Sequence, residues 1–196
     1  MKKVEHGKTF DRNAANPPAF EIFHNTVTEG YPKHWHTAIE IIMPTRGEYE
    51  VVVGKDSYNL KEGDIIMINS GVVHGMRFVS QGERIVMLVE PGCVENQEEM
   101  ETIFLRLPAI YFKKEDEEDP FYLFLRSQIL ELVREYDNEG AVMTHRICTG
   151  LKELFSEFGR KGFSDANAQN TFGAMKQQEY IEAVSVSYTH LTLPTT

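Results

Sequence analysis

The chain has 196 residues, 41% of them hydrophobic and 26% charged, which is typical of a folded globular protein. Its 30 acidic side chains outnumber 20 basic ones, and the formal net charge of −10 makes the chain as it stands a poor partner for nucleic-acid phosphates. The first residues contain no apolar segment of the kind found in a signal peptide, and no run approaches the roughly 20 apolar residues of a membrane helix. We therefore expect a cytoplasmic protein with no membrane partner, in which Cys93 and Cys148 are reduced thiols.

The first part of the chain is predicted to be mainly β. Residues 1–19 are polar and end in Asn-Pro-Pro-Ala, which predicts an N-terminal arm. Short segments rich in Val, Ile, Phe and Tyr then alternate with turn signals such as Lys-Glu-Gly-Asp. The predicted strands are 20–27, 39–44, 48–53, 57–60, 64–68, 74–79 and 83–90. Short strands at this spacing predict an antiparallel sandwich or barrel, which we place at residues 20–112.

A helical pattern replaces the β pattern in residues 113–160. Asp119 and Pro120 form a typical helix start, with the aspartate as N-cap and the proline in the first helical position. Apolar residues recur at helical spacing on both sides of a break at residues 138–140, which predicts an antiparallel helical hairpin. Two roles remain open for its apolar stripes: packing on the β domain, or forming the surface of a homodimer.

The candidate functional residues begin in the stretch from residue 33 to residue 47. His34, His36 and Glu40 share one parity, so in an extended strand their side chains point to the same side. With His74 they supply three imidazoles and a carboxylate, a set that suits iron, manganese, nickel, copper or zinc and does not select among them. The same residues could instead line an effector pocket and hydrogen-bond a polyol, with His24 of the first strand as a further candidate.

The spacing of these residues resembles the two sequence motifs of cupins. His34-x-His36, three residues, Glu40, six residues and Gly47 fit the first motif; Gly63, and then Gly71, two residues and His74, fit the second. Asn69 stands where the second motif usually has proline, and Phe78 where it has asparagine. The resemblance implies a cupin barrel, that is, a double-stranded β-helix or jelly roll. It also implies that the four positions able to bind metal in metallo-cupins are filled by their usual residue types.

Over roughly residues 18–184, the arm, barrel and hairpin resemble the N-terminal half of AraC-type transcription regulators. That resemblance implies an effector-binding and dimerisation domain of the arabinose-binding kind, with a small, sugar-like effector in the barrel and usually no metal. It implies a homodimer through the hairpin and DNA binding only through a further C-terminal domain. Residues 161–176, rich in Gly, Ser, Asn and Gln, fit a linker, and residues 177–184 resemble the start of that domain.

Two functions follow from these patterns. The first is a ligand sensor with no catalytic residue and no required cofactor. The second is a small metal-dependent cupin enzyme, a dioxygenase or an isomerase, in which a divalent transition metal is held by the four candidate ligands. The hairpin and residues 177–184 favour the sensor, whereas the complete ligand set favours the enzyme.

The last segment, residues 185–196, does not continue the helical pattern. Val186–Thr195 match, residue for residue, the translation of a transposon-end adapter used in sequencing libraries. We therefore expect residues 185–196 to be an artefact that replaces the natural continuation of the chain. Sequencing the genomic locus beyond codon 184 should reveal two helix-turn-helix units in the same frame. A genomic copy of codons 185–196 followed by a stop codon would contradict this expectation.

Overall fold

The computed structural model describes residues 19–26, 30–93, 108–116, 118–138 and 140–161. Apart from Ala19 and Lys161, the predicted arm (1–19), linker (161–176), start of a DNA-binding domain (177–184) and adapter-derived segment (185–196) lie outside the described residues.

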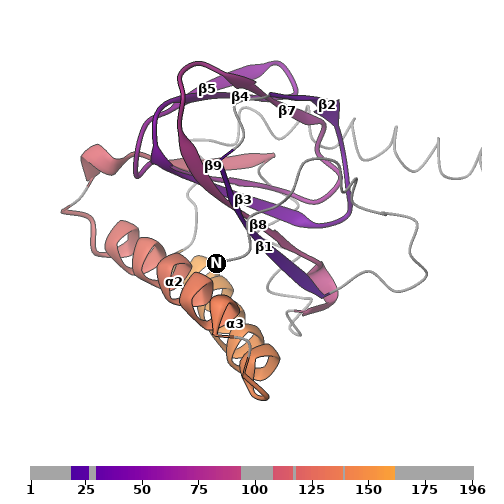
Figure 1. The fold of residues 1–196 in the computed structure, drawn as a ribbon, viewed down its shortest axis with the longest axis vertical. Coiled ribbons are helices and arrows are strands. Elements are labelled where there is room, and N and C mark those ends of the chain that lie inside the picture. The colour runs from indigo at the N-terminus through magenta and orange to yellow at the C-terminus, as the bar shows by residue number, and fades with distance from the viewer. Residues whose placement is uncertain (1–18, 27–29, 94–107, 117, 139, 162–196) are drawn as a thin grey trace, which may run out of the picture.

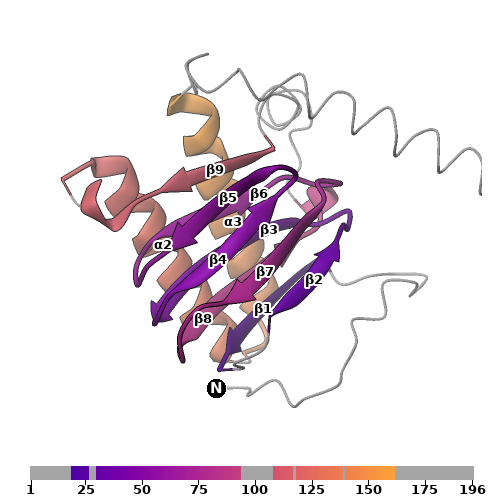
Figure 2. The ribbon, with the colours of Figure 1, turned by 90° about the horizontal axis from the view of Figure 1, so that it is seen from above.

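Two antiparallel sheets face each other and form a barrel (Figure 1). The five-stranded sheet has the order β1 (Phe20–Asn25), β8 (Glu83–Val89), β3 (Ile39–Arg46), β6 (Ile65–Ile68) and β9 (Ala109–Phe112). The four-stranded sheet has the order β2 (Tyr31–His34), β7 (His74–Phe78), β4 (Tyr49–Val53) and β5 (Asp56–Leu60). Figure 2 shows the smaller sheet lying over the larger one, with the helices on the far side.

The chain continues from the barrel into two helices, α2 (Pro120–Asp137) and α3 (Met143–Lys161), with short 3-10 turns at η1 (Pro91–Cys93) and η2 (Lys114–Asp116). The predicted mainly β domain followed by a helical hairpin is therefore confirmed. The prediction lacked β9 and did not define β2. Strand β2 is short, carries Pro32 and lies at a sheet edge, where a missing backbone N–H costs no ladder hydrogen bond.

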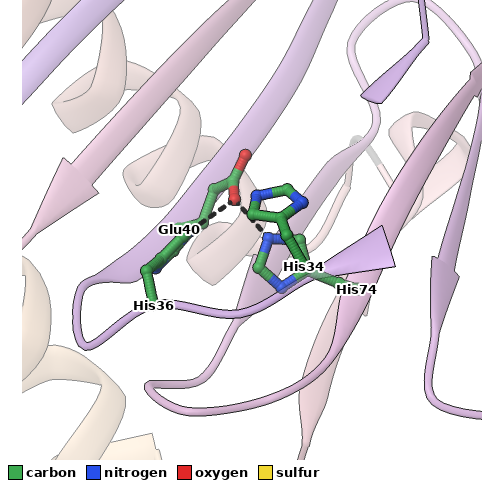
Figure 3. Close-up of side chains that lie close together, drawn as sticks. All are labelled: His34, His36, Glu40 and His74. Atoms are coloured by element: carbon green, nitrogen blue, oxygen red, sulfur yellow. Dashed lines mark hydrogen bonds and ion pairs between the residues drawn. The ribbon is translucent and has the colours of Figure 1, made fainter. Parts of the chain in front are cut away.

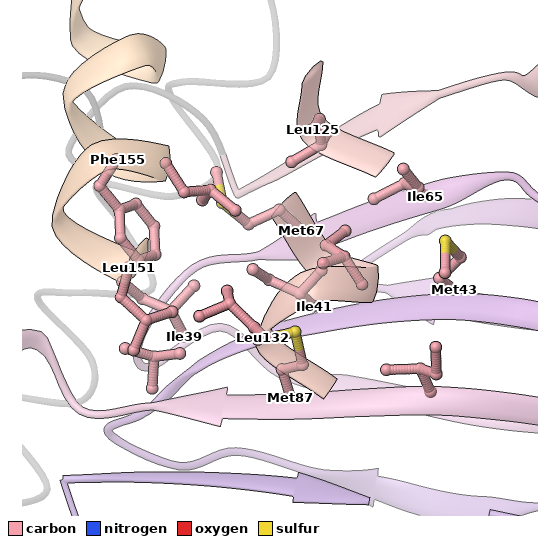
Figure 4. Close-up of a cluster of buried hydrophobic side chains, with 14 of the residues drawn as sticks. Ile39, Ile41, Met43, Ile65, Met67, Met87, Leu125, Leu132, Leu151 and Phe155 are labelled. Atoms are coloured by element: carbon pink, nitrogen blue, oxygen red, sulfur yellow. The ribbon is translucent and has the colours of Figure 1, made fainter. Parts of the chain in front are cut away.

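The five-stranded sheet is buried on both faces. On β3, Ile39, Ile41 and Met43 belong to a core shared with both helices, whereas Ile42 belongs to a second core inside the barrel. Figure 4 shows the first core, in which side chains of β3, β6 and β8 meet Leu125, Leu132, Leu151 and Phe155 of the helices. Burial on both faces explains why β6 is a continuous apolar run and why the apolar run at the start of β3 is interrupted only by Glu40.

The start of α2 follows the predicted capping. The side chain of Asp119 accepts a hydrogen bond from the Phe121 N–H at 2.8 Å, and Pro120 occupies the first turn, where its missing N–H leaves no bond unmade. The helices are antiparallel, because Arg146 of α3 pairs with Glu135 of α2 at 2.9 Å while Gly150, one turn later, lies against Leu132, one turn earlier. A Cβ at Gly150 would lie 2.9 Å from the Leu132 Cδ2 atom, so glycine permits this close approach.

The apolar stripes of the hairpin pack on the barrel. The stripe residues that are fully buried within this single chain are Leu125, Ile129, Leu132, Ile147, Leu151, Leu154, Phe155 and Phe158. Of the two roles left open by the sequence, packing on the β domain therefore accounts for them. A dimer surface on the hairpin would have to use its outer side, where Leu123 is 50% exposed.

We expect the two leucines of α2 to differ sharply in their effect on stability. Leu132→Ala should lower the free energy of unfolding by about 2–5 kcal/mol, because it leaves a cavity between helix and sheet. Leu123→Ala, on the exposed side of the same helix, should change it by about 0.5 kcal/mol or less. Urea unfolding followed by circular dichroism measures both, and equal losses would contradict this assignment of the buried face.

Candidate metal and effector site in the barrel

Four polar side chains from both sheets converge inside one end of the barrel (Figure 3). His34 ends β2 and His74 begins β7, and these two residues are paired across the four-stranded sheet. Glu40 lies on β3 in the five-stranded sheet, and His36 lies in the connection between β2 and β3. The four residues predicted as a cluster are thus brought together, but not by one strand as their shared parity suggested, because the chain leaves the smaller sheet after His34 and enters the larger one at Ile39.

A backbone hydrogen bond joins the two loops that carry His36 and His74. The Gly71 N–H donates to the His36 carbonyl oxygen at 2.8 Å, and the Val72 N–H closes the turn onto the Asn69 carbonyl at 3.3 Å. Gly71 has a φ of 73°, in the left-handed region that favours glycine, which explains why the second motif requires glycine three residues before the histidine.

All three imidazoles are fixed through Nδ1. The Nδ1 atom lies 2.9 Å from the Pro32 carbonyl in His34, 2.8 Å from the Ala38 carbonyl in His36 and 2.8 Å from the Val72 carbonyl in His74. A carbonyl oxygen can only accept, so each Nδ1 must carry the proton. In the neutral ring Nε2 is then unprotonated, which is the usual state of a histidine that binds metal.

Two of these Nε2 atoms meet the same carboxylate oxygen. Glu40 Oε2 lies 3.1 Å from the Nε2 atom of His36 and 2.7 Å from that of His74. Two neutral imidazoles with their protons on Nδ1 would turn lone pairs towards an oxygen that also carries lone pairs. Such a convergence is favourable only when protons or a metal ion supply positive charge between the atoms.

The dimensions and donor types of the cluster fit a divalent transition metal. One ligand atom from each of the four residues lies within 4.8 Å of the other three. His36, Glu40 and His74 are buried, while His34 is only partly buried and forms the side of the cluster nearest to solvent. Three nitrogen donors and one oxygen donor in this arrangement match the first shell of iron, manganese, nickel, copper or zinc.

The electrostatics of the cluster favour an ionised Glu40. Burial alone would raise the pKa of this carboxyl, but hydrogen bonds and charge interactions with His36 and His74 outweigh burial and lower the pKa below its usual range. A carboxylate held in its charged form inside a barrel is ready to neutralise a bound cation.

Two charged residues on the barrel face of the five-stranded sheet were missed by sequence reasoning. Glu21 and Glu40 are both paired with Leu88, on opposite sides of β8, so both carboxylates lie on the barrel face of the sheet. Burial raises the pKa of Glu21. Arg84 is fully buried, with its guanidinium carbon 4.8 Å from the centre of the Tyr49 ring and 5.7 Å from that of Tyr31. The sequence feature that could have revealed Arg84 is the presence of a charged residue within the mostly apolar strand 83–89.

His24 lies on the other face of the sheet. It is paired with Ile85, and Ile85 belongs to the core shared with the helices. Its Nε2 atom lies 3.8 Å from a carboxylate oxygen of Glu83, outside the barrel interior. The structure therefore separates His24 from the pocket for which it was a candidate, because alternation along β1 turns Glu21 and Phe23 inward instead.

Residues 25–90 match the family model of the Cupin domain, a span that contains all four clustered residues. The barrel is a cupin domain. Among the described residues, none of the helices that follow it is both long and apolar enough to cross a membrane.

Several solved structures are similar to this chain. ToxT from Vibrio cholerae O395 is 11% identical with a TM-score of 0.46, over 76% of this chain and 59% of ToxT. A cupin-2 domain protein from Shewanella frigidimarina is 16% identical with a TM-score of 0.35, over 39% of this chain and 76% of that one. Oxalate decarboxylase from Bacillus subtilis, described with Mn(II) centres, is 19% identical with a TM-score of 0.32, over 35% of this chain and 20% of the enzyme. This chain thus spans about three fifths of ToxT. No curated protein matches it.

We expect the purified protein to bind about one equivalent of a divalent transition metal, with the cluster as its ligands. His36→Ala should abolish stoichiometric binding, because it removes a buried ligand atom that faces Glu40. His24→Ala is the matched control, since it removes a histidine that lies outside the cluster. Elemental analysis after dialysis against each metal measures the content. Equal metal in wild type and His36→Ala, or none in either, would contradict this assignment.

Proposed function

We propose that this chain is the ligand-sensing half of an AraC-type regulator of DNA-templated transcription, and that its effector binds in the cupin barrel beside His34, His36, Glu40 and His74. One observation carries the proposal. Strand β3 presents Glu40 to the cluster, while its neighbours Ile39 and Ile41 pack on the helical hairpin. A ligand that displaces Glu40 therefore acts on the same strand that supports the hairpin.

This arrangement can transmit binding by a shift in population. Suppose that the protein has two states that differ in the position of the hairpin on the sheet. An effector that binds one state more tightly will increase the population of that state, and the difference between its two binding free energies sets the size of the shift. The packed core between β3 and the helices makes a small backbone movement costly to absorb locally, so the movement is passed on to the hairpin. In a longer protein the hairpin would in turn position a DNA-binding domain.

The chemistry of the barrel face supports a small polar effector. Glu40 and Glu21 supply carboxylates and the three histidines supply ring nitrogens, all groups that hydrogen-bond hydroxyls. A sugar or related polyol matches this set. A divalent metal held by the cluster would add a Lewis acid able to bind a ligand oxygen directly.

A homodimer forms part of the proposal. The buried stripe of the hairpin is already covered by the barrel, so the outer surface of α2 around Leu123 is the part of the described hairpin that we expect to meet a second copy. DNA binding would require a further, more basic domain, because this chain has a net charge of −10.

A small metal-dependent cupin enzyme is the second candidate, favoured by the complete set of four ligand residues. In that case Glu40 and the histidines would hold the metal, and Glu21, with its raised pKa, would be placed on the same barrel face to exchange protons with a substrate. An isomerase or a dioxygenase would fit this donor set.

Thermal unfolding with a panel of sugars and polyols, with and without added metal, separates the two candidates. The sensor should be stabilised by one compound that it leaves chemically unchanged, by about 2.7 kcal/mol at a ligand concentration of 100 times Kd. Light scattering in the same samples should show a dimer.

In the thermal unfolding experiment, Glu40→Gln should abolish the stabilisation by the ligand, whereas His24→Ala should retain it. Metal-dependent conversion of the stabilising compound would establish the enzyme instead, and a monomer at every concentration would exclude the dimer.

A further inference from the structure

The two cysteines of this chain lie in contact, although 55 positions separate them in the sequence. Cys93 ends η1, directly after β8, and its N–H donates to the Glu90 carbonyl at 2.9 Å. Cys148 lies in the first half of α3. Their Sγ atoms are 3.4 Å apart, and both side chains are partly buried against the core between the sheet and the helices. No other cysteine is present in the sequence.

We propose that Cys93 and Cys148 form a reversible disulfide that fastens α3 to the end of the barrel. A disulfide requires the two sulfurs at about 2.05 Å, so they must approach each other by about 1.4 Å. Rotation about the two Cα–Cβ bonds changes the distance between the sulfurs while the backbone stays in place. The site is independent of the metal cluster and of the proposed function.

The oxidation needs a two-electron acceptor, for which we name a low-molecular-weight disulfide. The thiolate of one cysteine attacks a sulfur of that molecule, forms a mixed disulfide and expels one thiolate. The second cysteine then attacks the protein sulfur and expels the other. The protein loses two electrons and two protons, and the small disulfide becomes two thiols. An excess of small thiol reverses both steps.

The surroundings of the pair favour slow exchange. Burial, followed by the hydrogen bond and charge interaction with Cys148, raises the pKa of the Cys93 thiol to about 12, and Lys152 offsets this only in part. The thiolate is the reactive form, and a raised thiol pKa leaves little of it at neutral pH. The protein should therefore be oxidised only slowly at neutral pH, and the rate of disulfide formation should increase with pH.

The disulfide would constrain the junction between the barrel and the helical hairpin. It would close a loop that contains β9 and α2 and would fix α3 against the segment that leaves β8. Constraining so long a loop limits the unfolded chain, which stabilises the folded form. It would also hold the hairpin in its present position on the sheet.

The test uses the full chain incubated at pH 8 with glutathione disulfide, then quenched by alkylation. Intact mass should show a monomer two hydrogens lighter with no alkylated thiol, and digestion should yield one cross-linked pair of peptides. The melting temperature should rise by about 5–10 °C over the reduced form and return when reduced glutathione is added.

The control is the double variant Cys148→Ser/Thr149→Cys, which keeps two thiols but turns the second one about 100° around α3, to an exposed position. It should give mixed disulfides with glutathione and no internal bond. Wild-type protein that keeps both thiols, carries a glutathione on each, or forms only cross-linked dimers would overturn the proposal. An internal bond that leaves the melting temperature unchanged would overturn its role in fastening α3.

Discussion

The alternation of side chains along β3 is the constraint on which the rest of this structure depends. Glu40 and Ile42 face the inside of the barrel, and Ile39, Ile41 and Met43 face the hairpin. A slip of one residue would turn Glu40 into the apolar core under α2 and α3 and would turn Ile41 towards three histidines. The hydrogen-bonded registers with β6 and β8 on its two sides prevent that slip. The polar site and the hairpin contact are therefore set by one register.

The buried polar cluster lowers the stability of the folded barrel. Glu40 is 7% exposed, His36 8% and His74 3%, so the folded chain removes these groups from water at a point where an apolar core would be more stable. The compensation comes from the backbone carbonyls that hold each Nδ1 atom and from the positive charge, of protons or of a metal ion, that the contacts between Nε2 atoms and Glu40 require. Buried polar side chains that do not stabilise the fold are typical of a binding site.

Much of the fold could be predicted from the sequence, because turn residues, strand patterns and the Asp119-Pro120 cap act locally. The members of the cluster could be predicted from motif spacing, but their arrangement could not. His34 and Glu40 belong to different sheets, and a parity rule applies only within one strand. His24 was misplaced for the opposite reason, since parity within β1 does not tell which face is the inner one. The contact between Cys93 and Cys148 depends on how α3 lies across the sheet, which no local pattern encodes.

The hydrogen bond from Gly71 to the His36 carbonyl has a consequence for how this barrel tolerates change. It makes the connection at residues 35–38 and the turn at 69–73 a single unit, with one histidine fixed on each side. Surface loops usually accept insertions at small cost, but a change of length in either of these would move one imidazole relative to the other. The exposed connection at residues 140–142, between the two helices, has no such tie to the site. Insertions, tags or fused domains should therefore be accepted at the tip of the hairpin and rejected at the rim of the barrel.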